Sequence, residues 1–369
     1  MKKTFYYWVL FTFSFLSAIM LAAQTPKLNN AFNASTGIVM DSKGNAFVTG
    51  KNNKIIKITS QGKAELFAGG GRNNKDGLGK EAGFYNSAGI AIDSEDNLYI
   101  ADGPVIRKVT PAGFVSTIAG SGNYGYKDGE KATAMFAGVE SIAIDNKGTI
   151  YVTDHEYSPQ GSTGYYYIRK ITAAGIISTI TNGNAGELKL HYPRGIACDA
   201  AGNLYVCAGV SHCIKKITPS GIITTVAGQC DKTKFNSVYK EGPIATAVLT
   251  DPTGIAIAKN GDIYITDLRL HRIIKIAGNK VVTVAGTGKF NFTGNPAGAA
   301  EPGYADGKAL TARFDLPSAI AFDRNDNLFI IDRSRRNNSY IRKFSTDGMV
   351  TTFCKHEWNP KTSQYEEVE

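Results

Sequence analysis

Short apolar runs, each bounded by a turn, repeat along this chain at a nearly fixed period. The first run of each unit has the form Gly-Ile-Ala-Ile-Asp or a close variant, and six copies begin at Gly37, Gly89, Ser141, Gly195, Gly254 and Ala319. Their starts are 52, 52, 54, 59 and 65 residues apart. A sequence period of this length is typical of repeated supersecondary units, so the chain is expected to contain six equivalent modules.

Each unit contains four apolar runs separated by Gly, Asn or Asp turns. In the fourth unit the later runs are 203–208, 214–217 and 222–226, and Thr218-Pro-Ser-Gly221 forms the last turn. Ile, Val, Tyr and Thr dominate the runs, as in antiparallel strands joined by hairpins. Because such a sheet cannot bury both faces alone, stacking the units around an axis is the stable solution. We therefore predict an all-β fold, one six-bladed β-propeller of four-stranded antiparallel blades, over residues 37–354.

Two kinds of residue recur at one position in several units, which favours structural roles. An aromatic residue in the second run is expected to pack between blades; the six are Phe47, Tyr99, Tyr151, Tyr205, Tyr264 and Phe329. An aspartate ends the second run in four units, at Asp102, Asp154, Asp267 and Asp332. A ring of carboxylates could bind Ca²⁺, but we favour turn capping or pairing with Arg107, Arg169 or Arg342. Asp41, Asp93, Asp145, Asp199 and Asp323, which end the first run, are likewise expected to be structural.

The succession of motifs resembles the NHL repeat. An Asp-Gly lead-in that ends in Ala-x-Phe occurs at 128–136 and 306–314, and it is followed by Gly-Ile-Ala-x-Asp, Asn-Leu-Tyr-x-x-Asp and Ile-Arg-Lys runs. The signature histidine is kept at His212 and His271, whereas the first unit has Asn52-Asn53-Lys54 instead. The resemblance covers about residues 37–354 and implies a six-bladed propeller. It implies no single activity, because similar propellers bind proteins, bind RNA, or act as lyases and lactonases.

The N-terminus is typical of an export signal. Lys2-Lys3 precede an apolar stretch from Phe5 to Leu21, and Ala22-Ala23 supply the small residues of a cleavage site. We expect 1–23 to be a bacterial signal peptide, 24–36 a lead segment, and the mature protein to be periplasmic or extracellular without a membrane span. A retained anchor helix is the alternative. Residues 355–369 are expected to form a polar C-terminal tail.

Composition and charge limit the class of protein and the kinds of partner that are expected. The 369 residues are 43% hydrophobic and 20% charged, which excludes a disordered chain. The net charge of +9 comes from Lys and Arg that are spread along the chain, so we expect no nucleic acid partner. We also expect the protein to be a monomer. Of the five cysteines, Cys198, Cys207, Cys213, Cys230 and Cys354, four lie close together in sequence. One or two local disulfides are expected, their pairing is open, and at least one cysteine stays unpaired.

Loop length distinguishes the two faces of the ring. Turns between the first and second strands and between the third and fourth are short and lie on one face. The second-to-third turns and the connections between blades lie on the other, here called the loop-rich face, and include the long segments 155–167, 229–251 and 287–317. Function is expected there, on a binding module for a protein, peptide or saccharide. The candidate ligand-binding residues are Tyr157, Tyr165, Tyr166, Arg194, Arg269, Arg333, Arg335 and Arg336.

The alternative is a metal-dependent lyase or hydrolase that resembles peptide-amidating lyase or lactonase propellers. The peptide-amidating enzymes hold zinc through histidines, and His155, His191 and His271 are the candidates, since all three lie in loops of the loop-rich face. Lactonase-like propellers use a cage of Glu and Asn or Asp, which is not expected because no Glu opens a first strand. Motifs of serine hydrolases, phosphate-binding loops and zinc proteases are absent. We therefore favour a non-enzymatic protein without a cofactor, and keep Ca²⁺ or Zn²⁺ as the alternatives.

Overall fold

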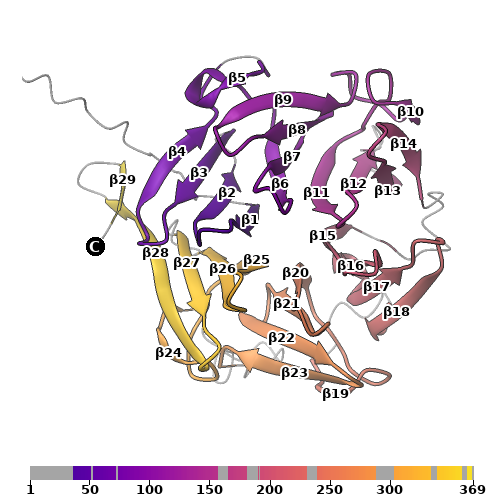
Figure 1. Cartoon of the computed structure of the whole chain (residues 1–369). Helices are drawn as coiled ribbons and strands as arrows, with labels where there is room; N and C mark the ends of the chain where they lie inside the picture. The colour runs from indigo at the N-terminus through magenta and orange to yellow at the C-terminus, as the bar shows by residue number, and fades with distance from the viewer. Residues whose placement is uncertain are drawn as a thin grey trace, which may run out of the picture.

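Six antiparallel sheets surround a common axis in the computed structural model (Figure 1). The structure describes residues 36–50, 53–71, 74–156, 165–180, 190, 192–230, 239–287, 303–333, 339–359 and 364–367. The expected all-β, six-bladed propeller is therefore confirmed. The expected signal peptide and most of the lead segment lie outside the described residues. Within these ranges no helix has the length and apolar character needed to cross a membrane.

Each blade is built from one continuous stretch of chain. Blade one holds β1 (Gly37–Met40), β2 (Ala46–Gly50), β3 (Lys54–Ile58) and β4 (Ala64–Ala68). Blade two holds β5 (Gly77–Leu78), β6 (Ser87–Ile92), β7 (Leu98–Asp102), β8 (Val105–Val109) and β9 (Phe114–Ala119). Blade three holds β10 (Gly129–Glu130), β11 (Val139–Ile144), β12 (Ile150–Glu156), β13 (Tyr165–Ile171) and β14 (Ile176–Thr179).

The second half of the ring repeats this order. Blade four holds β15 (Pro193–Cys198), β16 (Leu204–Ala208), β17 (Cys213–Ile217) and β18 (Ile223–Gly228). Blade five holds β19 (Gly242–Pro243), β20 (Pro252–Ile257), β21 (Ile263–Asp267), β22 (Arg272–Ala277) and β23 (Lys280–Ala285). Blade six holds β24 (Gly307–Lys308), β25 (Pro317–Phe322), β26 (Leu328–Arg333), β27 (Ser339–Phe344), β28 (Met349–Asn359) and β29 (Gln364–Glu367). Two short 3-10 helices, η1 (Gly79–Glu81) and η2 (Gly209–Ser211), lie in connections.

Four blades carry a fifth, outermost strand that the sequence did not reveal. The two-residue strands β5, β10, β19 and β24 each pair with the fourth long strand of their own blade. In three of these blades the strand begins at the Gly of the Asp-Gly lead-in, and the preceding aspartate accepts hydrogen bonds from a threonine of the neighbouring strand, as Asp128 does from Thr179. The lead-in motif is therefore an edge strand that covers the outermost long strand of the blade.

The last sheet extends into the segment expected to be a polar tail. β28 continues past Cys354, because His356 pairs with Ser339 of β27 and Lys355 with Tyr340. β29 then pairs with β28 along residues 364–367. Backbone pairing therefore carries the last long strand beyond residue 354.

Each gap between two blades is filled by one hydrophobic cluster. Between blades one and two, for example, Phe47 of β2 packs with Ile90 and Leu98 of the next blade. The clusters confirm that the repeated aromatic residue packs between blades. Blades six and one meet in the same way, with Ile38 of β1 and Phe329 of β26 in one cluster. Among the described strands, side-chain packing thus closes the ring, and no strand from one end of the chain enters the sheet of the other.

Aspartates of the first run cap the turn that follows it. Asp41 accepts the backbone N–H of Lys43 at 2.9 Å and of Asn45 at 2.8 Å through Oδ1. The same two contacts recur at Asp93, Asp145, Asp199 and Asp323. Their structural role is therefore confirmed in five blades, whereas blade five has Ala258 at this position.

Three of the aspartates that end the second strand are paired with a buried arginine, as expected. Arg169 bonds Asp154 at 2.7 Å, Arg107 bonds Asp102 at 3.1 Å, and Arg342 bonds Asp332 at 3.2 Å. Asp267 instead accepts backbone N–H groups of Thr250, Asp251 and Leu270. All four carboxylates are thus held by structural contacts rather than facing the axis.

Blade four lacks this ion pair, because Ala208 and Lys215 stand at the positions of the aspartate and the arginine. It contains the disulfide Cys213–Cys230 instead, which joins β17 to the segment after β18. One local disulfide is therefore found, and Cys198, Cys207 and Cys354 do not take part in it. Burial raises the pKa of Cys198 to about 12 and also raises that of Cys207, which disfavours the thiolate form of both.

Candidate functional site

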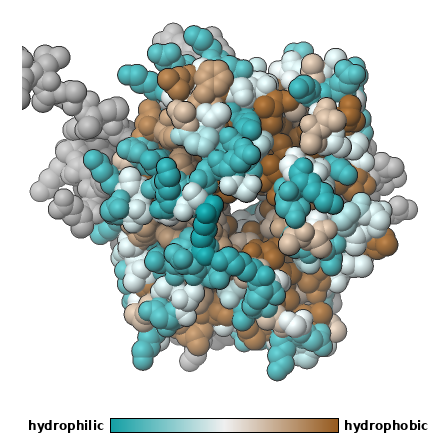
Figure 2. Space-filling view, viewed as in Figure 1, coloured by the Kyte–Doolittle hydropathy of each residue, from teal (hydrophilic) through white to brown (hydrophobic). Residues whose placement is uncertain are grey.

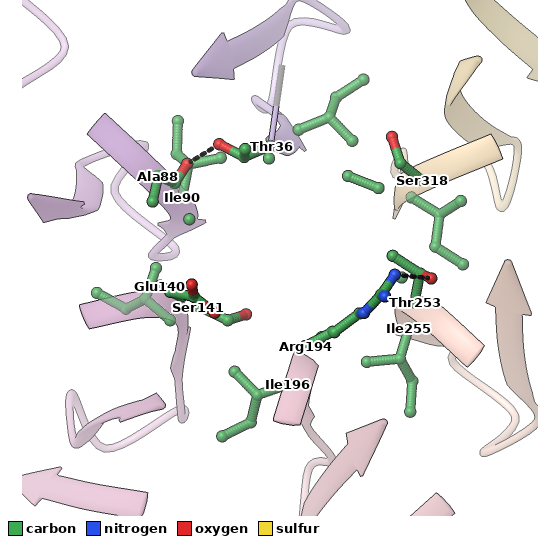
Figure 3. A pocket seen from close by; sticks show the side chains of 18 of the residues that line it. Thr36, Ala88, Ile90, Glu140, Ser141, Arg194, Ile196, Thr253, Ile255 and Ser318 are labelled. Carbon is green, nitrogen blue, oxygen red and sulfur yellow. Dashed lines mark hydrogen bonds between the residues drawn. The ribbon is translucent and has the colours of Figure 1, made fainter. Parts of the chain in front are cut away.

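A cavity of about 390 Å³ lies on the ring axis, where the six innermost strands begin (Figure 3). Each strand contributes three consecutive positions, of which the first faces the mouth and the third lies deepest. Because first strands begin on the loop-rich face, this cavity, here called the axial pocket, opens on the face expected to carry function. Figures 1 and 2 view the ring from the side opposite to that of Figure 3, and in the view of Figure 2 hydrophilic residues gather around the axis.

The deepest position of the axial pocket is an isoleucine in every blade. The six residues are Ile38, Ile90, Ile142, Ile196, Ile255 and Ile320, and all are buried. The middle position is Gly, Ser or Ala, because the strands approach closely at the axis. At Gly254, for instance, a Cβ atom would clash with the carbonyl oxygen of Ser318. The pocket therefore has an apolar base formed by six equivalent side chains.

The mouth position differs from blade to blade. Its six residues are Thr36, Ala88, Glu140, Arg194, Thr253 and Ser318. These six positions thus carry one carboxylate, one guanidinium, three hydroxyl groups and the methyl group of Ala88. Glu140 is the second residue of β11, the first strand of blade three, which begins at Val139. The repeated motif recognised in the sequence begins one residue later, at Ser141, and therefore does not include Glu140.

Residues of blade five contact the guanidinium of Arg194 and fix its position. Its guanidinium donates to Thr253 Oγ1 at 3.1 Å and lies 3.5 Å from a carboxylate oxygen of Asp251 (Figure 3). Arg269, in the turn after the second strand of blade five, contacts the other oxygen of Asp251 at 3.5 Å. Burial raises the pKa of Asp251, although both guanidinium groups oppose that shift. Asp251 therefore orients two of the candidate arginines.

Arg333 lines the axial pocket from the end of β26. Its backbone N–H donates to Leu316, but its Nε is buried and has no hydrogen-bond partner. Burial and the neighbouring charge of Arg194 both lower the pKa of Arg333. Two of the predicted ligand-binding arginines, Arg194 and Arg333, are thus brought to the same pocket by different blades.

A second cavity of about 440 Å³, here called the lateral groove, adjoins the axial pocket and shares Asn86 and Glu140 with it. Tyr124 and His155 also line the lateral groove. The Nε2 atom of His155 lies 3.7 Å from a carboxylate oxygen of Glu140. Glu140 thus stands at the junction of the two cavities, next to an imidazole.

Aromatic side chains border the axial pocket on the side of blades three and four. Tyr192 lines the pocket, and its ring lies 5.4 Å from that of the candidate Tyr166. Tyr166 in turn stacks on His155 with ring centroids 6.2 Å apart. These rings connect the axial pocket to the histidine of the lateral groove.

Known proteins resemble both the sequence and the fold. The family model of the teneurin NHL domain matches residues 181–364. SUPPRESSOR OF QUENCHING 1 of Arabidopsis thaliana is 26% identical over 311 residues, which cover 78% of this chain and 27% of that protein. Teneurin-3 of Mus musculus is 26% identical over 285 residues, which cover 71% of this chain and 10% of that protein. With six blades bearing the repeat motifs, these matches decide the family.

The chain is an NHL-repeat β-propeller.

Solved structures with low identity share this fold. A Bacteroides thetaiotaomicron protein of unknown function has a TM-score of 0.59 at 16% identity, covering 81% of this chain and 66% of that one. An auxiliary nutrient binding protein from Bacteroides ovatus has a TM-score of 0.56 at 15% identity, covering 81% and 67%. A gluconolactonase from Xanthomonas campestris has a TM-score of 0.51 at 14% identity, covering 83% and 85%.

The repeat histidines of this NHL-repeat propeller connect neighbouring blades. Nδ1 of His212 bonds the carbonyl oxygen of Thr250, and Nδ1 of His271 bonds that of Asp315. Both histidines are buried, and both have a left-handed backbone conformation, with φ of 55° and 54°. His271 therefore has a structural role and lines neither cavity, whereas His155 lines the lateral groove.

The remaining predicted site residues are only partly within the described chain. Tyr157, His191, Arg335 and Arg336 lie outside the described residues, and only the backbone of Tyr165 is described. Among described residues, no group of three or more His, Cys, Asp or Glu side chains is placed to bind a metal ion. The described part of the NHL-repeat propeller therefore does not fit a three-ligand zinc centre.

Glu140, Thr253 and Tyr192 were not among the predicted site residues. For Glu140 and Thr253 the signal was in the sequence, because both occupy the position before the repeated Gly, Ser or Ala of the first strand. Tyr192 had no repeat signal, since it lies in the connection before β15.

Proposed function

We propose that this NHL-repeat propeller is a binding module that holds a small peptide or saccharide ligand, or the end of a larger one, in the axial pocket. The observation that carries the proposal is the contrast within that pocket. Its base is the same residue in all six blades, while its mouth carries Glu140, Arg194 and hydroxyl groups. An apolar lining with a few convergent polar groups is typical of ligand sites.

The fold match to a protein named as an auxiliary nutrient binding protein supports a binding role. We further propose that the chain is exported, as Lys2-Lys3 and the apolar stretch after them indicate, and that it acts as a monomer with one axial site. A single site on the axis suits a monomer, because six different blades complete it.

Filling the pocket tests this function. In Ala88→Phe a large ring enters the axial pocket from its wall, whereas in Ala201→Phe the same ring is added to an exposed turn on the opposite face. Libraries of short peptides and oligosaccharides would be screened by thermal shift, and hits measured by calorimetry. Wild type and Ala201→Phe should bind the same compounds, and Ala88→Phe should lose them. Equal binding by all three proteins, or no binding compound in either library, would refute an axial site of this kind.

A metal-dependent lyase or hydrolase is the second candidate. The observation that favours it is the Glu140–His155 pair, because a carboxylate beside an imidazole can hold and move a proton next to a ligand. Metal analysis of the purified protein distinguishes the two functions. Stoichiometric zinc that is lost in His155→Ala would favour the enzyme, and a metal-free protein that binds its ligand would favour the binding module.

A further inference from the structure

Arg333 lines the axial pocket, and the contacts of its side chain leave a hydrogen-bond donor and its charge without partners among the described residues. Its Nε is buried without a hydrogen-bond partner. In the part of the chain that the structure describes, no carboxylate lies within ion-pair distance of its guanidinium. A guanidinium stays charged at neutral pH, and a desolvated charge without a partner is unfavourable. A bound anion would supply the hydrogen-bond acceptor and the negative charge that the described residues do not supply.

The neighbours of Arg333 strengthen this preference for an anion. Arg194 lies near enough for its charge to lower the pKa of Arg333. Asp251 offsets part of the charge of Arg194, but it also contacts Arg269. The positive charge on this side of the pocket therefore exceeds the negative charge of its one carboxylate partner.

The rest of the pocket limits what kind of anion fits. Glu140, on the opposite side of the mouth, repels a ligand with a second negative charge (Figure 3). The six isoleucines at the base offer no hydrogen bond, so hydroxyl groups placed there would lose their contacts with water. An aliphatic group buried on the same surface is favourable.

We infer that the axial pocket selects a ligand in which a single carboxylate is joined to a compact aliphatic group. The carboxylate accepts hydrogen bonds from Arg333, with Arg194 beside it, and the aliphatic group contacts the isoleucine base. Two oxygen atoms in one plane match the fork of a guanidinium. This inference rests on the proposed function, because it names the ligand class of the same site.

Four small probes separate the contributions to binding. 4-Methylpentanoate carries both groups, 4-methylpentanamide lacks the charge, galacturonate carries a carboxylate on a hydroxylated ring, and inorganic phosphate lacks the aliphatic part. Each would be titrated by NMR into wild type, Arg333→Gln, Arg333→Lys and Arg324→Gln. Arg324 is an exposed arginine in the short turn after β25, so its variant changes the net charge equally, away from the pocket.

Wild type should bind 4-methylpentanoate about tenfold or more tightly than the amide, as expected for a charge-assisted hydrogen bond. Arg333→Gln should bind the two compounds equally, Arg333→Lys should keep part of the preference, and Arg324→Gln should match wild type. Melting temperatures measured in parallel should show that Arg333→Gln is folded, because it removes a charge that has no protein partner.

Equal binding of acid and amide by wild type, or an unchanged preference in Arg333→Gln, would overturn the inference. Tighter binding of galacturonate or phosphate than of 4-methylpentanoate would overturn it too, as would no binding by any probe. The proposed function is judged separately by the Ala88→Phe screen. If the screen finds a neutral ligand that Ala88→Phe does not bind, the proposed binding module is supported and the inferred carboxylate ligand is refuted.

Discussion

Arg169 connects three segments of blade three through one buried guanidinium, and its removal should unfold the propeller more easily. The side chain has no exposed surface. Nη1 donates to Asp154 at 2.7 Å and to the carbonyl oxygen of Met135 at 3.2 Å. Nη2 donates to Asp128 at 2.8 Å and to the carbonyl oxygen of Lys127 at 3.0 Å. The second strand, the third strand and the lead-in segment thus meet at this residue.

The size of the effect follows from what the substitution leaves behind. Arg169→Met fills much of the same space but leaves Asp154, which is fully buried, without its cation. Burial already raises the pKa of Asp154. Breaking a buried ion pair from one side costs about 3–5 kcal/mol of unfolding free energy. The exposed Arg324→Met serves as the control and should change stability by less than about 0.5 kcal/mol.

Urea unfolding at pH 7, followed by circular dichroism, measures these differences. The double variant Arg169→Met/Asp154→Asn gives the sharper comparison. Its amide oxygen can still accept the backbone N–H groups of Ala137 and Gly138, which Asp154 accepts at 2.9 and 2.8 Å, while the unpaired charge is gone. It should therefore be more stable than Arg169→Met alone. A single variant within about 1 kcal/mol of wild type, or a double variant that is less stable still, would refute the reasoning.

Three further predictions test other parts of the ring. Burial and the Asp251 carboxylate raise the pKa of Asp267 to about 6, so its contribution to stability is complete below pH 4 and is lost as the pH rises past 6. Urea titrations at pH values across this range would give the unfolding free energies of wild type and Asp267→Asn. The wild-type value minus the variant value should fall by about 3 kcal/mol as the pH rises, and a difference that does not change with pH would contradict the prediction. Cys213→Ala removes the disulfide to Cys230, which spans 17 residues, and should lower stability by about 3 kcal/mol without reductant but far less with it. Gly254→Ala should lower the melting temperature by several degrees, because its Cβ would clash with the backbone of the next blade, and an unchanged value would contradict the close packing at the axis.

The repeat made the fold predictable. Six copies of one strand pattern predicted the number of blades, and an aromatic at one position, such as Tyr99, predicted the packing between them. The pairing of Asp102 with Arg107 followed from their recurrence at fixed positions in other blades. These features could be found because the same physical requirement is met several times in one sequence.

Features that occur once could not be found in that way. The Cys213–Cys230 pairing depends on how β17 and the end of β18 approach each other, which spacing does not determine. The edge strands are two residues long, too short for an alternating pattern to show. That Arg333 faces the axial pocket without a partner depends on contacts among blades four, five and six, and only the folded ring brings these together.

Comparison of the blades with one another gives a general route to the site. At the base of the axial pocket all six blades require the same side chain, because six equivalent strands meet there and leave the same space. One residue earlier along the same strands that requirement is gone, and the blades carry Thr36, Ala88, Glu140, Arg194, Thr253 and Ser318. A charged residue such as Glu140 or Arg194 is not needed there for the fold, since Ala88 fills the equivalent position in blade two. In a symmetric repeat, the place where the symmetry breaks beside a cavity is therefore the place where side chains are free to serve a ligand.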